Sequence, residues 1–173
     1  MPRTSAGLLL YRHDDAGDLL VLLVHPGGPY WRHRDVGAWS IPKGEVGPGE
    51  DPATVAAREF GEELGHPPPP PPWLDLGEVT QAGGKRVRAW AAEGDLDPAA
   101  LASNTFELEW PPRSGRRQTF PEVDRAQWAP LEVARRLVVA AQATLLDRLV
   151  AAVTGQPPGD GADRRATPLG DAP

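Results

Sequence analysis

Short apolar runs separated by polar turns fill the first part of the chain. Residues 5–11 and 18–25 are rich in leucine and valine, and the polar segment RHDDAG separates them. Apolar runs of this length, bounded by turn residues, predict two β-strands. Because both runs are continuously apolar instead of alternating, we expect a sheet whose two faces are both covered.

A helix is predicted after a loop at 26–39 that is rich in glycine, proline and aromatic residues. Asp51 is a favourable N-cap, Pro52 suits the first helical position, and Gly65 stands where a C-terminal cap is expected. Together these residues predict a helix over residues 52–64. On a helical wheel, the arc expected to pack on the sheet holds Ala53, Ala56, Ala57, Phe60 and Leu64.

The rest of the chain mixes strand and helix patterns. Strands are predicted at 73–81, 85–93, 103–110 and 124–128, with Gly83 and Gly84 forming the turn between the first two. The six prolines at 67–72 predict an extended spacer, and residues 131–153 have the pattern of one helix or two consecutive helices. This mixture predicts an α/β or α+β domain with helices on both sides of a mixed sheet.

The size and composition of the chain fit a single domain. A length of 173 residues with 40% hydrophobic content provides one core and little room for a second. We expect this domain over residues 1–154. Residues 155–173 contain almost nothing that could be buried, so we expect a flexible tail there.

Charge and cysteine content exclude several classes of function. The net charge of -6 argues against a general nucleic-acid-binding surface. The chain has no cysteine, which excludes disulfides, thiolate catalysis and cysteine-based zinc sites. The N-terminal segment MPRTSAGLLLYRHDD lacks a signal-peptide pattern, and no apolar run is long enough to cross a bilayer. We therefore expect a cytoplasmic protein that does not enter membranes.

Three glutamates crowd one side of the predicted helix. Glu59, Glu62 and Glu63 fall within about 100° of one another on the wheel, and Val55 is an apolar exception in that arc. Such pairs on an exposed helix cost only about 0.2–0.5 kcal/mol each, so a solvated acidic face is one interpretation. The other is a cation site, because clustered carboxylates and a backbone carbonyl are ligands that Mg²⁺ and Mn²⁺ prefer. The glycine-rich segment 44–49 favours the second, since glycines let the backbone approach a ligand closely.

The spacing around these glutamates resembles the Nudix box. That motif consists of Gly, five residues, Glu, seven residues, Arg-Glu, an aliphatic residue, any residue, Glu-Glu, any residue, Gly and another aliphatic residue. The charged and glycine positions are filled here by Gly44, Glu50, Arg58, Glu59, Glu62, Glu63 and Gly65. The chain departs from the motif at Phe60 and His66, which are packing positions. The resemblance implies the Nudix fold, an α/β/α sandwich around a mixed β-sheet.

The resemblance also implies roles for the motif residues. Nudix hydrolases bind a divalent metal and the diphosphate of a substrate at this loop and helix. The implied metal ligands are Glu59, Glu62, Glu63 and the carbonyl of Gly44 or of its neighbour Lys43. Glu50 and Arg58 would form an ion pair that fixes the loop to the helix, and the cofactor would be Mg²⁺ or Mn²⁺.

The general base is a separate question. Glu59 or Glu63 could accept the proton, but many family members use a carboxylate outside the box. We favour Glu122, which lies six residues before Trp128 in FPEVDRAQW, a spacing similar to that in some relatives. A plain surface position is an equal alternative for Glu122, and the two glutamates of FELEW are rival candidates.

Several basic and aromatic residues are candidates for substrate contact. Lys43 directly precedes the glycine-rich segment, which favours contact with a phosphate. Arg86 and Arg88 could add further contacts, and the arginines of PPRSGRRQTF lie in a predicted loop that could cover the site. Trp31 and Trp39 could stack on a base, although buried aromatic residues more often belong to the core.

Taken together, the resemblance implies a divalent-metal-dependent pyrophosphohydrolase. Its substrate would be a nucleoside diphosphate linked to another moiety, such as a dinucleoside polyphosphate, an ADP-ribose-like molecule or a nucleoside triphosphate. One alternative is a Nudix-like sensor that binds a nucleotide without cleaving it. Another is an acidic helix that merely resembles the box. Because many relatives dimerise, a homodimer is also an expectation.

Overall fold

A computed structural model describes residues 2–156 of the chain. The predicted tail therefore lies outside the described residues from 157 onward. The strands are β1 (Thr4–His13), β2 (Leu19–Pro26), β3 (Lys43–Glu45), β4 (Leu74–Thr80), β5 (Arg86–Glu93), β6 (Thr105–Glu109), β7 (Arg117–Pro121) and β8 (Val123–Pro130). The helices are α1 (Pro52–Leu64), α2 (Leu131–Leu137) and α3 (Ala143–Thr154), so the C-terminal helical pattern forms two helices.

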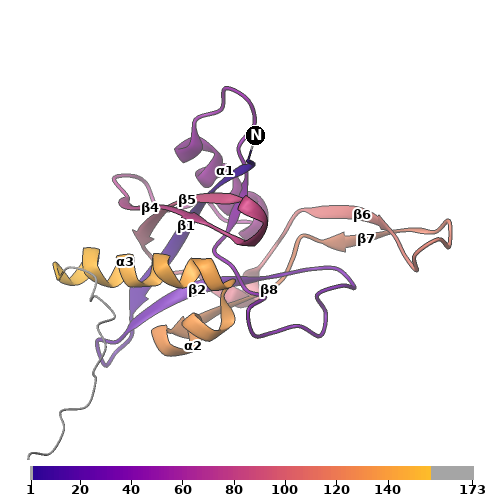
Figure 1. The fold of residues 1–173 in the computed structure, drawn as a ribbon. Coiled ribbons are helices and arrows are strands. Elements are labelled where there is room, and N and C mark those ends of the chain that lie inside the picture. Colours follow the sequence, from indigo (N-terminus) through magenta and orange to yellow (C-terminus); the bar gives the residue numbers. More distant parts are fainter. Residues whose placement is uncertain (1, 157–173) are drawn as a thin grey trace, which may run out of the picture.

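A mixed six-stranded sheet forms the centre of the fold (Figure 1). Its order is β4-β5-β1-β2-β8, and β3 pairs with β1 off this path. The pairing of β1 with β5 is parallel, whereas the other pairings in this sheet are antiparallel. The β4–β5 hairpin turns at Gly83 and Gly84, both with positive φ, as predicted.

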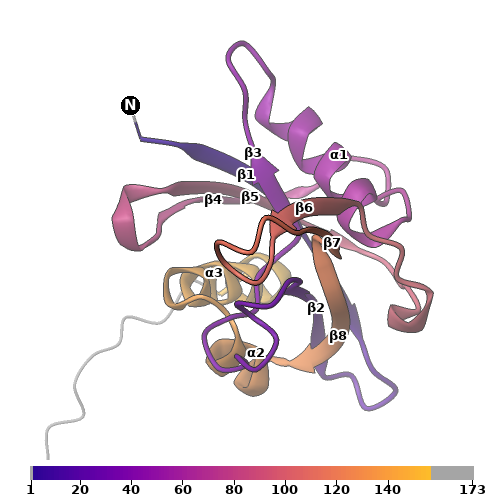
Figure 2. The same cartoon turned by 90° about the vertical axis from the view of Figure 1, so that its right-hand side faces the viewer.

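Helices cover both faces of this sheet, which confirms the α/β/α sandwich (Figure 2). One apolar cluster joins α1 to alternate residues of β1 and β2, including Leu8, Leu22 and Phe60. The other joins α2 and α3 to the opposite residues of the same strands, including Leu9 and Leu23. Coverage on both faces explains why residues 5–11 and 18–25 are continuously apolar.

The ends of α1 are those predicted from its capping residues. Asp51 Oδ2 accepts a hydrogen bond from the Thr54 backbone N–H at 3.0 Å and another from the Thr54 hydroxyl at 2.9 Å. Gly65 ends the helix in the left-handed region, with φ 75°. The bounds Pro52–Leu64 therefore confirm the expected helix.

We expect Asp51→Ala to lower the free energy of unfolding by about 1 kcal/mol, because the first turn of α1 loses its capping acceptor. Urea denaturation monitored by circular dichroism measures this change. Asp15→Ala is the matched control, since Asp15 is exposed in the β1–β2 turn. Equal stability of the two variants would contradict the capping role.

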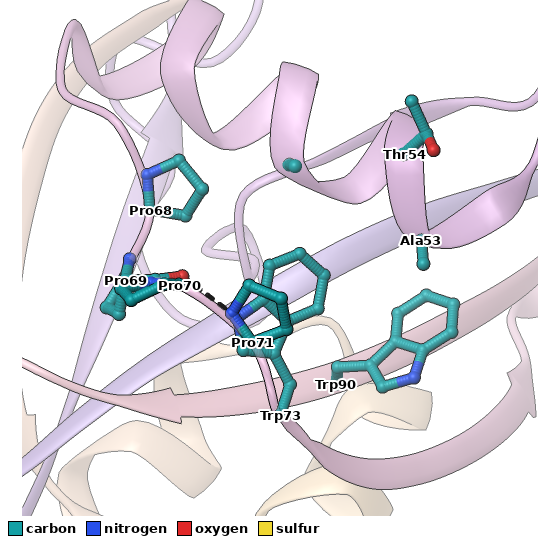
Figure 3. Close-up of a pocket in the computed structure, with 9 residues that line it drawn as sticks. Ala53, Thr54, Pro68, Pro69, Pro70, Pro71, Trp73 and Trp90 are labelled. Carbon is teal, nitrogen blue, oxygen red and sulfur yellow. Dashed lines mark hydrogen bonds between the residues drawn. The ribbon is translucent and has the colours of Figure 1, made fainter.

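The burial of α1 adds two details to the helical wheel. Val55, the apolar exception in the acidic arc, is fully buried and packs in the cluster beneath α1. Ala53 and Ala57, assigned to the sheet-facing arc, are only half-buried. They line an open groove of about 580 Å³ together with prolines of the proline run, Trp73 and Trp90 (Figure 3).

The segment after β5 forms a hairpin where a covering loop was expected. β6 and β7 pair only with each other, and the hairpin extends away from the central sheet (Figure 1). The predicted strand at 103–110 is confirmed as Thr105–Glu109, but PPRSGRRQTF is partly strand β7. Among residues 2–156, none of the helices has the length and apolar character needed to span a membrane.

Candidate functional site

The carboxylate of Glu59 lies directly against the backbone of β3. Gly44 pairs with Ala6 of β1, so its position is fixed by the sheet. A Cβ atom at Gly44 would overlap the carboxylate carbon and both carboxylate oxygens of Glu59. Glycine at this position therefore lets the Glu59 carboxylate lie directly against the backbone of β3.

Glu63 lies one turn further along α1 and faces Lys43. The backbone N–H of Lys43 donates to Glu63 Oε2 at 3.3 Å. Burial raises the pKa of Glu63 to about 8, with Glu59 acting in the same direction and Lys43 opposing it. Burial, followed by the nearby charge of Lys85, lowers the pKa of Lys43. Both residues are half-buried at the edge of β3.

Arg58 links the other acidic residues of the helix. Its Nη1 donates to Glu50 Oε1 at 2.6 Å, and its other nitrogens lie 3.6 Å from Glu59 and 3.9 Å from Glu62. Glu50 also accepts from the Gly47 N–H at 2.7 Å. These bonds, from Arg58 first and Gly47 second, lower the pKa of Glu50. For Glu59, burial and then Glu62 raise the pKa against the opposing charge of Arg58.

Glu122 reaches the same region from the junction between β7 and β8. Its backbone N–H donates to the Asn104 carbonyl at 2.8 Å, and its carbonyl accepts from the Gly27 N–H at 2.9 Å. Asn104 N–H in turn donates to the Glu62 carbonyl of α1 at 2.8 Å. The charge of Glu122 contributes to raising the pKa values of Glu59 and Glu63. The base of the hairpin therefore carries Glu122 to the acidic helix.

A cavity of about 230 Å³ lies between these groups. Its charged lining residues are Lys43, Glu63 and Glu122. The remaining lining residues are Val24, Pro26, Trp31, Ala38, Ser40, Ile41, Gln81 and Val139. Carboxylates and an ammonium group thus share one small cavity with mainly apolar walls.

The residues present fit a divalent cation by their chemistry. Carboxylate oxygens and a close backbone segment are hard ligands, and a carboxyl group with a raised pKa is one that a cation would ionise. Within residues 2–156, no three acidic or histidine side chains are already gathered as metal ligands.

The other candidates do not line this cavity. Arg88 Nη2 is 2.6 Å from Asp75 and its guanidinium lies over Trp90, while Arg86 is 3.5 Å from Glu78. The glutamates of FELEW lie on the outlying hairpin, where Glu107 is 3.5 Å from Arg117. Trp39 is a core residue, 1% exposed.

Sequence reasoning missed the contributions of Lys85 and Gln81. Lys85 acts on Lys43 from the β4–β5 turn, and Gln81 lines the cavity from the same turn. Both residues belong to ordinary turn sequence with no motif. Only the parallel pairing of β5 with β1 brings that turn near the glycine-rich segment.

The raised pKa of Glu63 predicts a pH-dependent stability of the metal-free protein. Its carboxyl ionises near 4.5 when unfolded but near 8 when folded, so the folded chain binds more protons between these values. Stability should then fall as the pH rises through this window, by at most about 1.4 kcal/mol per pH unit for one group. The lowered pKa of Lys43 has the opposite effect on stability. It makes stability rise with pH, but only at pH values above the pKa of Lys43 in the folded protein.

Urea unfolding in EDTA at several pH values across the window measures this dependence. Glu63→Gln should flatten the curve, because the amide does not titrate. Parallel curves for the two proteins would contradict the assignment of the proton to Glu63.

Comparison with known proteins identifies the family of this chain. The NUDIX domain family profile matches residues 1–149. A binary complex of the Ap4A hydrolase of C. elegans is 25% identical with TM-score 0.61, covering 87% of this chain and 98% of that chain. A second structure of that hydrolase is 26% identical with TM-score 0.58, covering 88% and 99%. The NUDIX domain of Shewanella oneidensis NrtR, in complex with ADP ribose, shares the fold. It is 16% identical with TM-score 0.58, covering 88% of this chain and 89% of that chain. The protein therefore belongs to the Nudix family and is a Nudix hydrolase.

Proposed function

We propose that this protein is a Mg²⁺-dependent pyrophosphohydrolase that cleaves the diphosphate of a nucleoside diphosphate linked to another moiety. The observation that carries the proposal is the convergence of Glu59, Glu63, Glu122 and Lys43 from α1, the β7–β8 junction and β3. Nudix hydrolases generally use divalent metals, and Mn²⁺ is the alternative to Mg²⁺ here. Carboxylates that raise one another's pKa in a cavity are a recognised feature of catalytic sites.

The metal ligands in this proposal are Glu59, Glu62, Glu63 and the backbone carbonyl of Gly44. A divalent cation supplies neutralisation of the diphosphate charge and a lower pKa for the attacking water. The Glu50–Arg58 ion pair fixes the loop 44–50 to α1, so the carbonyl and the carboxylates keep their relative positions. A bound cation would also offset the negative charge of the carboxylates and so favour the ionised form of Glu63 over the protonated form.

Glu122 acts as the general base. Its backbone is held on two sides, by Asn104 and Gly27, and its side chain lines the cavity. The carboxylate accepts a proton from water as the water oxygen attacks phosphorus and the bridging P–O bond breaks. Lys43 faces the same cavity and contacts a phosphate oxygen of the substrate. Arg86 and Arg88 are proposed as further substrate contacts, for which a phosphate would compete with their present partners Glu78 and Asp75.

Dinucleoside tetraphosphates are the first substrates to examine. The Ap4A hydrolase of C. elegans is 25–26% identical to this chain over nearly its whole length. ADP-ribose-like molecules and nucleoside triphosphates share the scissile diphosphate and are the other candidates.

The test is product analysis by chromatography after incubation with diadenosine tetraphosphate, ADP-ribose and nucleoside triphosphates. We expect cleavage of a P–O–P bond in at least one of them with Mg²⁺ or Mn²⁺, and none with EDTA. Binding without cleavage would favour the sensor alternative. Absence of both binding and cleavage with either metal would overturn the proposal.

A further inference from the structure

A fully buried glutamine organises the wall of the cavity next to the charged groups. Gln142 precedes α3 and is 0% exposed. Its Oε1 accepts a hydrogen bond from the Ile41 backbone N–H at 3.0 Å. Its Nε2 lies 3.1 Å from Ser40 Oγ and 2.9 Å from Gln81 Oε1. Ser40 and Gln81 both line the cavity.

The hydrogen bonds leave only one orientation for the Gln142 amide. A backbone N–H can only donate, so the atom that faces Ile41 N must be the oxygen of Gln142. Its nitrogen therefore donates to both remaining partners. Ser40 Oγ is free to accept, because its own proton goes to the Ile41 carbonyl at 2.7 Å.

The orientation of Gln142 fixes that of Gln81 in turn. Because Gln142 presents an N–H group, Gln81 must present its carbonyl oxygen to it. The Gln81 Nε2 has no hydrogen-bond partner among residues 2–156. Gln81 lines the cavity with its acceptor already used, and its amide N–H groups remain available to a ligand.

The uncharged walls of the cavity are mainly apolar. Val24, Ile41 and Val139 are apolar lining residues, and Trp31 adds an aromatic side chain that is 39% exposed. The volume of about 230 Å³ is below the roughly 300–1,000 Å³ that encloses a drug-sized ligand, so beside the phosphate at Lys43 the cavity leaves room for at most one ring system and not for a second nucleoside. Amide donors beside an apolar slot are a common way to recognise one base by its edge.

We propose that Gln81 is a specificity-determining residue that donates a hydrogen bond to an acceptor on the single nucleobase bound in this cavity. Gln142 is the positioning residue that fixes the direction of the Gln81 amide. The inference rests on the proposed function for the identity of the substrate. The moiety on the far side of the diphosphate then lies outside the cavity and is not read by Gln81.

The test compares the binding of nucleoside monophosphates with that of ribose 5-phosphate by calorimetry in magnesium chloride. We expect at least one of AMP, GMP, CMP and UMP to bind about tenfold or more tightly than ribose 5-phosphate. Gln81→Glu keeps an acceptor for Gln142 but replaces the cavity donor with an oxygen. This variant should remove the preference, measured as the ratio of the affinities for the monophosphate and ribose 5-phosphate, because the added negative charge acts on both phosphates alike.

Gln156→Glu is the matched control, because it makes the same charge change on an exposed residue after α3. It should keep the preference. Equal binding of all monophosphates and ribose 5-phosphate by the unmodified protein, or a preference that survives Gln81→Glu, would overturn the inference. The titrations measure binding without turnover, so the two proposals can fail separately. A protein that shows the base preference but cleaves no substrate would contradict only the proposed function. A protein that cleaves nucleotides but lacks the preference would contradict only the inference about Gln81.

Discussion

Glu63→Gln should lower kcat by about 10²–10⁴-fold, the range expected for loss of an essential catalytic group, while the fold is kept. Glu63 is the carboxyl with the pKa raised to about 8, so near neutral pH it is mainly protonated in the metal-free protein. An uncharged amide of the same shape then replaces an uncharged acid at little cost in stability. The amide cannot ionise, however, and it is a far weaker ligand for a hard cation.

The measurements are steady-state kinetics on the substrate found by product analysis, and urea denaturation of both proteins. Glu132→Gln is the control, since Glu132 is an exposed residue at the start of α2. Unchanged kcat in Glu63→Gln would remove this residue from the catalytic site. A large loss of stability with unchanged metal affinity would assign it a structural role instead.

The position and ends of α1 could be predicted because their causes are local. Asp51, Pro52 and Gly65 act within one turn of the chain, and each performs the expected task. The two apolar strands could be predicted equally well. A strand that is buried on both faces carries apolar residues at consecutive positions instead of alternating apolar and polar residues. The Nudix box lies on this same segment, which is why family and fold were accessible from the sequence.

Features that depend on distant contacts were not predictable. Val55 is buried because the first turns of α1 pack on the sheet. A helical wheel cannot show this, because it assigns the same surroundings to every turn of the helix. β7 contains an arginine, a glutamine and a threonine in series and becomes a strand only by pairing with β6. Gln142 is separated from Ile41 by 101 positions, and no local pattern marks that hydrogen bond.

The candidate site shows the same division. Glu59, Glu62 and Glu63 were identified from helical spacing, and the box placed Gly44 beside them. Gly44 pairs with β1, and β1 pairs with β5, whose turn carries Gln81. The proposed metal ligands thus lie in one contiguous segment, whereas Glu122 and the walls of the cavity come from several. Substrate preference is accordingly harder to predict from sequence than the reaction.

Gly44→Ala should reduce kcat by about 10²-fold through displacement of Glu59, since a shift of about 1 Å in a catalytic group can cost that much. The added Cβ would occupy the space of the Glu59 carboxylate. That carboxylate is the far end of a flexible side chain, so the chain relieves the overlap by moving Glu59 and the strand stays paired. Stability should therefore change by less than about 1 kcal/mol.

Gly61→Ala is the matched control for this variant, because it adds the same methyl group within α1. A Cβ at Gly61 has only the His66 carbonyl oxygen nearby, at 3.8 Å. It should keep full activity and gain up to about 1 kcal/mol of stability from the better helix propensity of alanine. Kinetics and urea denaturation of both variants decide the matter. Full activity in Gly44→Ala would show that the contact between Glu59 and β3 is not needed to hold Glu59 in its catalytic position. Loss of both activity and stability would show instead that Gly44 is needed for the pairing of β3 in the sheet.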